Sequence, residues 1–209
     1  MSYRTYVEEA TEDIKECLNE MGTQPIWFIG SGLFQRNFNG PTWVGLLQEL
    51  QSRCPQIPHE TGFYLQDGHS LERIGSEYTR YYRDWAWSHR DQFPRELFDA
   101  RISGSSYIKF EIKRIFDEVT PHSVDEIANQ NHQLEIELLR AVQPHAIITT
   151  NYDRFLETIF PDYQPIIGQQ ILRPDTMSIG EIYKIHGCIS QFQDLVFNDE
   201  DYEAFMNIK

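Results

Sequence analysis

Short apolar runs, separated by stretches with helical periodicity, organise the chain. Residues 6–21 carry an apolar residue every three or four positions, which predicts an amphipathic helix that ends at Gly22. The continuous apolar run 26–29 lies between a proline and a glycine and predicts a buried strand. A second run, 147–150, predicts another strand that stops abruptly at polar residues. Two buried strands far apart in the chain indicate an α/β sheet.

Residues 60–143 predict a mainly helical insertion between these two strands. Apolar positions with helical spacing predict helices near 108–119 and 134–142. An aromatic stripe at helical spacing precedes them, and such a stripe lies in the core more often than it stacks on a ligand ring. Its members are Tyr78, Tyr81, Tyr82 and Trp85.

The connections on either side are less regular. Residues 33–40 lack a helical period and predict a loop, whereas a helix is predicted to start at Pro41. Proline, glycine, glutamine and histidine predict a connecting loop over 51–70.

The remainder of the chain predicts further sheet elements. Apolar runs predict strands at 163–168 and 182–185 and a short strand at 195–197, and acidic residues mark the first turn of a helix at 199–205. The fold class is therefore α/β: a Rossmann-like three-layer domain with about four parallel strands and the helical insertion at about 60–143.

Three of these strands end in polar groups: Gly30–Gly32, Asn151–Asp153 and His186–Gly187. The carboxyl ends of parallel strands meet at one edge of a sheet, where open α/β sheets bind ligands. Each group also has an ordinary explanation, as a glycine turn, a helix cap or a hydrogen-bonded histidine. Their joint occurrence at strand ends favours a composite ligand site.

Composition narrows the classes of function. The 209 residues carry a net charge of −14, which argues against a basic surface that binds nucleic acid. It does not argue against a small anion held by backbone amides. The three widely separated cysteines offer no zinc motif, so no metal is expected. With no signal peptide and no apolar run near the roughly 20 residues that span a bilayer, a cytoplasmic protein without membrane contact is expected.

The order of these motifs resembles the sirtuin superfamily over residues 26–205. The specific matches are Thr149-Thr150-Asn151-Tyr152-Asp153 and Lys184-Ile185-His186-Gly187. The residues of these two motifs most resemble those of divergent sirtuin-like domains in bacterial anti-phage defence proteins, which hydrolyse NAD. A helix start with Pro41, Trp43 and Leu46 adds to the likeness.

The resemblance implies a role for each matched position. The backbone N–H groups of the glycine loop would hold the NAD pyrophosphate. Asn151 would orient the nicotinamide ribose or the attacking water, Asp153 would hold the nicotinamide carboxamide, and His186 would act as general base or stabilise the ribose. Asn151 and His186 are thus the expected catalytic residues. The expected NAD-binding residues are Gly30, Ser31, Gly32, Leu33, Asn151, Asp153 and His186.

The resemblance also bears on activity and context. No four-cysteine zinc module follows His186, which favours NAD hydrolysis to nicotinamide and ADP-ribose over protein deacylation. We expect residues 1–209 to be the N-terminal part of a longer, homo-oligomeric defence effector. Its C-terminal domain, a partner protein or a phage component would activate it. The alternatives are a non-catalytic sensor of NAD or ADP-ribose and, less favoured, an NAD-dependent deacylase.

Overall fold

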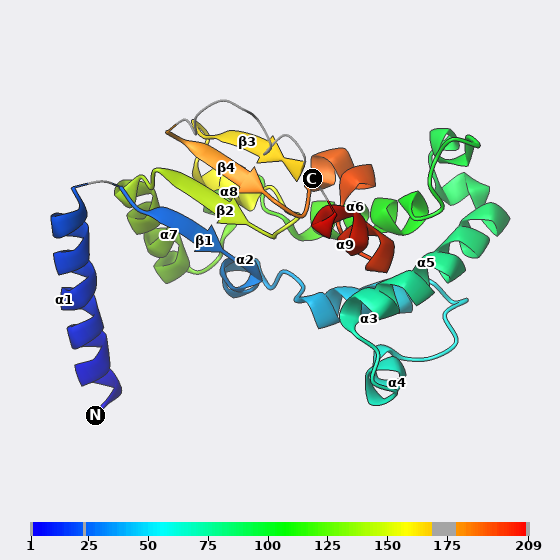
Figure 1. The fold of residues 1–209 in the computed structure, drawn as a ribbon, viewed down its shortest axis with the longest axis horizontal. Helices are drawn as coiled ribbons and strands as arrows, with labels where there is room; N and C mark the ends of the chain where they lie inside the picture. Colours follow the sequence, from blue (N-terminus) through cyan, green and yellow to red (C-terminus); the bar gives the residue numbers. More distant parts are fainter. Residues whose placement is uncertain (1, 23, 169–178, 208–209) are drawn as a thin grey trace.

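The computed structural model describes residues 2–22, 24–168 and 179–207 (Figure 1). The strands are β1 (Ile26–Ile29), β2 (Ala146–Thr149), β3 (Gln164–Ile167) and β4 (Glu181–Lys184). The α-helices are α1 (Tyr3–Met21), α2 (Ser31–Phe38), α3 (Trp43–Arg53), α4 (Thr61–Gln66), α5 (Leu71–Ser88), α6 (Ser106–Val119), α7 (Gln130–Val142), α8 (Phe155–Ile159) and α9 (Asp199–Met206).

The four described strands form one parallel sheet in the order β1-β2-β4-β3. Their register aligns Ile29 of β1, Thr149 of β2 and Lys184 of β4. The residues that follow these three strands therefore emerge at one edge of the sheet. Helices α3, α5, α6 and α9 lie beyond this edge (Figure 1). The predicted α/β fold is confirmed: a parallel sheet with helices, consistent with a Rossmann-like three-layer arrangement.

The two faces of the sheet are packed differently. Ile147 and Ile182, which are paired in register, belong to the large hydrophobic core together with Phe155 of α8. The opposite face contributes a small separate cluster, consisting of Ala146, Ile166 and Tyr183 with Ile148 and Ile185 against it. The first face therefore carries the main packing of the sheet.

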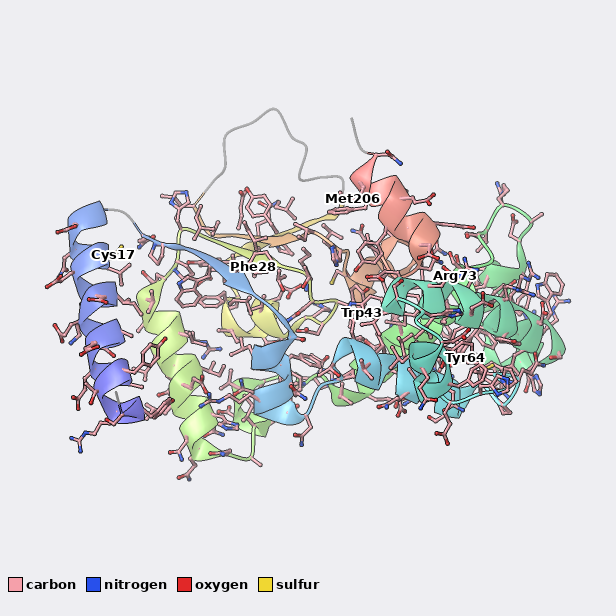
Figure 2. The ribbon with its side chains drawn as sticks, turned by 60° about the horizontal axis from the view of Figure 1, so that its bottom comes forward. Cys17, Phe28, Trp43, Tyr64, Arg73 and Met206 are labelled. Carbon is pink, nitrogen blue, oxygen red and sulfur yellow. The ribbon has the colours of Figure 1, made fainter. Side chains whose placement is uncertain are left out.

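Strand β1 was expected to be buried, and this expectation is wrong. Among the described strands it pairs only with β2, so it forms an edge of the sheet. Ile26 and Phe28 are exposed, and Trp27 and Ile29 are half-buried (Figure 2 labels Phe28). The four apolar residues gave no alternation from which a partly exposed strand could be recognised.

The loop predicted for residues 33–40 is also wrong, because α2 begins directly after Gly30. Phe34 and Phe38 are four residues apart and contact each other edge to face, with ring centroids 4.1 Å apart. Asn39, in the left-handed conformation with φ 56°, ends the helix. Only two of its eight residues are buried, which is too few for a clear period in the sequence.

The helical insertion between β1 and β2 is confirmed. Its aromatic stripe lies in the core, as predicted: Tyr78, Tyr82 and Trp85 of α5 are buried and Tyr81 packs against the same core. The loop expected over 51–70 contains the short helix α4. The Thr61 hydroxyl lies 3.1 Å from the Tyr78 hydroxyl and joins α4 to α5.

Residues 195–197 do not form the predicted strand. They pair with no described strand, and the Val196 N–H donates to the carbonyl of His186 at 3.0 Å. They lead into α9, whose start is fixed by a capping box between Asn198 and Asp201. The predicted helix at 199–205 is thereby confirmed, and it lies next to the end of β4.

Helix α1 ends at Gly22, which adopts the left-handed conformation with φ 60°, as the sequence predicted. It stands at one end of the molecule beside α7 (Figure 1). Its side chains Tyr3, Tyr6 and Ile14 are exposed. In the part of the chain that the structure describes, no helix is long and apolar enough to cross a membrane.

Candidate functional site

The carboxyl ends of β1 and β2 are joined by polar contacts. The buried Thr149 hydroxyl donates to the carbonyl of Ile29 at 2.7 Å and accepts from the Asn151 backbone N–H at 3.0 Å. The side-chain amide of Asn151 donates to the carbonyl of Gly30 at 3.1 Å. Its amide oxygen makes no hydrogen bond to another described residue. Asn151 is therefore oriented by both strands and keeps an acceptor available.

Asp153 is the other polar residue of this turn, and it is only 2% exposed. Its Oδ1 accepts from the Phe155 N–H at 2.8 Å, which caps the start of α8. Its Oδ2 is buried without a hydrogen-bond partner among the described residues. Burial raises the pKa of Asp153 to about 6, although the nearby Lys184 ammonium opposes this. An unpartnered buried carboxylate oxygen is costly unless a ligand satisfies it.

The glycine loop presents bare backbone to solvent. A Cβ atom placed on Gly30 or Gly32 would meet no atom within 4 Å. Gly30 caps α2 and Ser31 is its first residue, so the N–H groups at the start of this helix are available to an anion. These groups suit the pyrophosphate of a dinucleotide without any basic side chain.

A pocket of about 70 Å³ brings Ser31, Asn151 and Asp153 together. Its remaining walls are mostly aromatic or apolar and come from segments distant in sequence. Trp43 lies between the sheet and the distal helices (Figure 2) and stacks on Phe197 at 5.4 Å. The other lining residues are Phe34, Pro41, Thr42, Leu46, Phe116, Thr150 and Tyr152. The chemistry of this lining, rather than its present volume, suits a planar group with a polar end.

The remaining predicted residues lie outside this pocket. Gly30, Gly32 and Leu33 line a neighbouring surface hollow of about 450 Å³ along β1. His186, which follows β4, is not among the described residues that line either cavity.

The imidazole of His186 instead packs edge to face against Tyr202 and Phe205 of α9, with centroids 5.3 and 5.4 Å away. Burial lowers the pKa of His186, so the ring is neutral at pH 7. Gly187 has φ 91°, and a Cβ there would lie 3.0 Å from the Asp194 carbonyl. The chain therefore needs glycine to turn directly after His186.

A buried charged network beneath the pocket was not foreseen. Lys184 is fully buried, and its ammonium donates to the Asp153 carbonyl and to both carboxylate oxygens of Glu157, at 3.0 and 3.2 Å. The Cys188 thiol lies 3.9 Å from Glu157. A lysine within an apolar run was the available signal, because a charged side chain in a buried strand needs a partner.

The described residues include no group of three or more histidine, cysteine, aspartate or glutamate side chains that could hold a metal ion.

Comparison with known protein families identifies the region around this site. Residues 145–209, which contain Asn151, Asp153 and His186, match the family described as SIR2-like domain. This match supports a sirtuin-like domain that includes residues 145–209. A search of curated proteins found no match. SIR2-like domains use NAD as a substrate, and the bare glycine backbone and the unpartnered Asp153 oxygen both fit such a ligand.

Proposed function

We propose that this sirtuin-like domain is an NAD glycohydrolase that cleaves NAD to nicotinamide and ADP-ribose. The observation that carries the proposal is the pocket in which Asn151 and the unpartnered oxygen of Asp153 face an aromatic wall. Nicotinamide is a flat aromatic ring with a carboxamide, and its complement is an apolar slot with a hydrogen-bond acceptor at one end.

Binding would use both strand ends. The carboxamide N–H₂ of NAD donates to Oδ2 of Asp153, which satisfies the buried oxygen. The pyrophosphate lies on the backbone N–H groups at the start of α2, where Gly30 and Gly32 leave the approach open. The nicotinamide ribose then lies between these two points, next to Asn151.

In the reaction, the bond between the anomeric carbon and the nicotinamide nitrogen breaks, and its electron pair neutralises the pyridinium. Positive charge develops on the ribose as in glycoside hydrolysis. The free amide oxygen of Asn151 accepts a hydrogen bond from water and directs its oxygen to the anomeric carbon. The water proton passes to His186, whose neutral imidazole can accept it. The products are nicotinamide and ADP-ribose.

The geometry favours regulated activity. A cavity that binds benzene has a volume of roughly 150 Å³, about twice that of this pocket. His186 is also packed between two aromatic rings of α9. Cleavage therefore requires the lining side chains to move and His186 to face the ribose. An activator that causes this movement fits the resemblance to anti-phage effectors, and we propose that a partner protein or a phage component activates a homo-oligomer of this protein.

The packing of His186 favours one alternative, a sensor that binds NAD or ADP-ribose without cleaving it. Such a protein needs the pocket and the glycine loop, but it has no use for a general base that faces the ligand. The two functions make opposite predictions about the fate of bound NAD.

The test is to incubate the full-length protein with NAD, alone and with lysate of phage-infected cells, and to quantify nicotinamide and ADP-ribose. The enzyme releases equal amounts of both, and Asn151→Ala or His186→Ala lowers the rate at least about 100-fold, as loss of a positioned catalytic group does. Asn131→Ala and His122→Ala, at exposed positions, are matched controls with unchanged rates. Full activity in both site variants would reject the assignment. If calorimetry shows that NAD binds and NAD stays intact under all these conditions, the protein is a sensor. If an acyl-lysine peptide is consumed together with NAD, the protein is a deacylase.

A further inference from the structure

The stability of the fold does not by itself explain the buried ion pair between Lys184 and Glu157, which lies next to Asp153. Lys184 and Glu157 are 0% and 15% exposed at their side chains, and their closest atoms are 3.0 Å apart. Replacing such a pair with apolar residues of similar volume is often neutral or stabilising, because both charges must be removed from water. A charged pair at this position is therefore better explained by the site that it contacts.

Its contacts lead directly to Asp153. The Lys184 ammonium donates to the backbone carbonyl of Asp153, in the turn that also presents Asn151. Lys184 is level with Thr149 on the neighbouring strand, and Thr149 holds the other end of the same turn. The turn is thus fixed at one end by a neutral hydrogen bond and at the other by a cation.

We propose that Lys184 is a positioning residue of this site, whose buried ammonium fixes the Asn151–Asp153 turn and keeps the Asp153 carboxyl ionised for its ligand. This inference rests on the proposed function, since that proposal gives Asp153 its contact with NAD. The charged groups described around Asp153 are Lys184 from β4 and Glu157 from α8, with the Cys188 thiol beyond Glu157. Trp43 and Leu46 of α3 and Phe116 of α6 add apolar walls.

Electrostatics supports this role. Burial lowers the pKa of Lys184, but Glu157, Cys188 and Asp153 outweigh burial and raise it, so the ammonium stays charged. Burial raises the pKa of Asp153 to about 6; Lys184 lowers it and Glu157 raises it. The two neighbours therefore act on the pKa of Asp153 in opposite directions, and Lys184 is the one that favours the ionised carboxyl.

The experiment follows the Asp153 carboxyl directly in the full-length protein. Carbon-13 at the aspartate carboxyl is observed by NMR from pH 4 to 9, and the signal that Asp153→Asn removes identifies the residue. Lys184→Met is expected to move the titration midpoint upward by roughly one pH unit or more, the effect of losing a nearby opposite charge. Glu157→Gln is expected to move the midpoint downward.

Midpoints that stay in place, or that move in the same direction in both variants, overturn the inference. If Lys184→Met alone does not fold, the double variant Lys184→Met/Glu157→Gln, which leaves no unpaired charge, is compared with Glu157→Gln, and its midpoint must be the higher of the two. NAD cleavage is measured on the same proteins. Opposite shifts without any NAD cleavage by the activated wild type would reject the proposed function and retain the effect of Lys184 on Asp153. Cleavage with unmoved midpoints would retain the function and reject the role of Lys184.

Discussion

Replacing Asp153 with asparagine should stabilise the protein at neutral pH. Asparagine has the shape of aspartate, so its oxygen can keep the 2.8 Å hydrogen bond from the Phe155 N–H. Its amide group replaces the buried oxygen that has no partner. The change therefore removes a buried negative charge while the cap of α8 remains.

The expected magnitude follows from the pKa of this carboxyl. Burial raises the pKa of Asp153 from 3.8 to about 6, a difference of about 2 units, and each unit corresponds to about 1.4 kcal/mol. Because the folded-state pKa is the higher one, the folded protein binds more protons between pH 4 and 6. The contribution of this carboxyl group to the free energy of unfolding of the wild type is therefore fully present below about pH 4 and is lost as the pH rises through about 6. Asp153→Asn avoids that loss, which is about 3 kcal/mol at pH 7.

Urea unfolding near pH 4 and at pH 7 measures this difference. Other carboxylates titrate in both proteins, so the informative quantity is the change in free energy of unfolding between variant and wild type at each pH. The change should be near zero at pH 4 and about 3 kcal/mol in favour of the variant at pH 7. Asp162→Asn, in the exposed turn before β3, is the matched control and should show no such dependence. A variant that is no more stable than wild type at pH 7 would refute the reasoning.

Two further substitutions test the framework around the site by urea unfolding. Thr149→Val removes a buried hydroxyl that serves two backbone groups and should cost about 2 to 3 kcal/mol. Thr79→Val, which loses a hydroxyl bonded only within its own helix, should change the free energy by less than about 0.5 kcal/mol, and equal effects would contradict the account. Lys109→Met leaves the Asp201 carboxylate without its 2.6 Å partner and should cost about 3 kcal/mol. Lys113→Met, at a more exposed pair on the same helix, should cost less than about 1 kcal/mol, and a larger loss there than at Lys109 would reverse the argument.

The four strands of the described sheet and the positions of the candidate residues at their ends could be predicted because each depends on local sequence. An apolar run followed at once by Asn151 or His186 marks the end of a strand. That strands β1, β2 and β4 are parallel neighbours then brings their ends to one edge. Helix α2 could not be predicted, because Phe34 and Asn37 are its only buried residues and two positions show no helical period of apolar residues.

The walls of the pocket could not be predicted in the same way. Leu46 and Phe116 belong to helices separated by many residues, and their meeting over Asn151 depends on how the helical insertion folds back on the sheet. The orientation of His186 toward α9 likewise depends on tertiary packing. Lys184 did carry a signal, as a charge in a buried strand, but its partner Glu157 is identified only by the fold.

The central claim is that the polar groups at the ends of β1 and β2 form one NAD site. The most direct measurement is a crystal structure of the full-length Asn151→Ala variant with NAD, since the variant should bind the substrate without cleaving it. The account predicts the nicotinamide carboxamide within hydrogen-bonding distance of Asp153 Oδ2, and the pyrophosphate on the backbone of Gly30 and Gly32. NAD bound elsewhere, or bound with its nicotinamide outside the pocket of Ser31 and Asp153, would contradict the account.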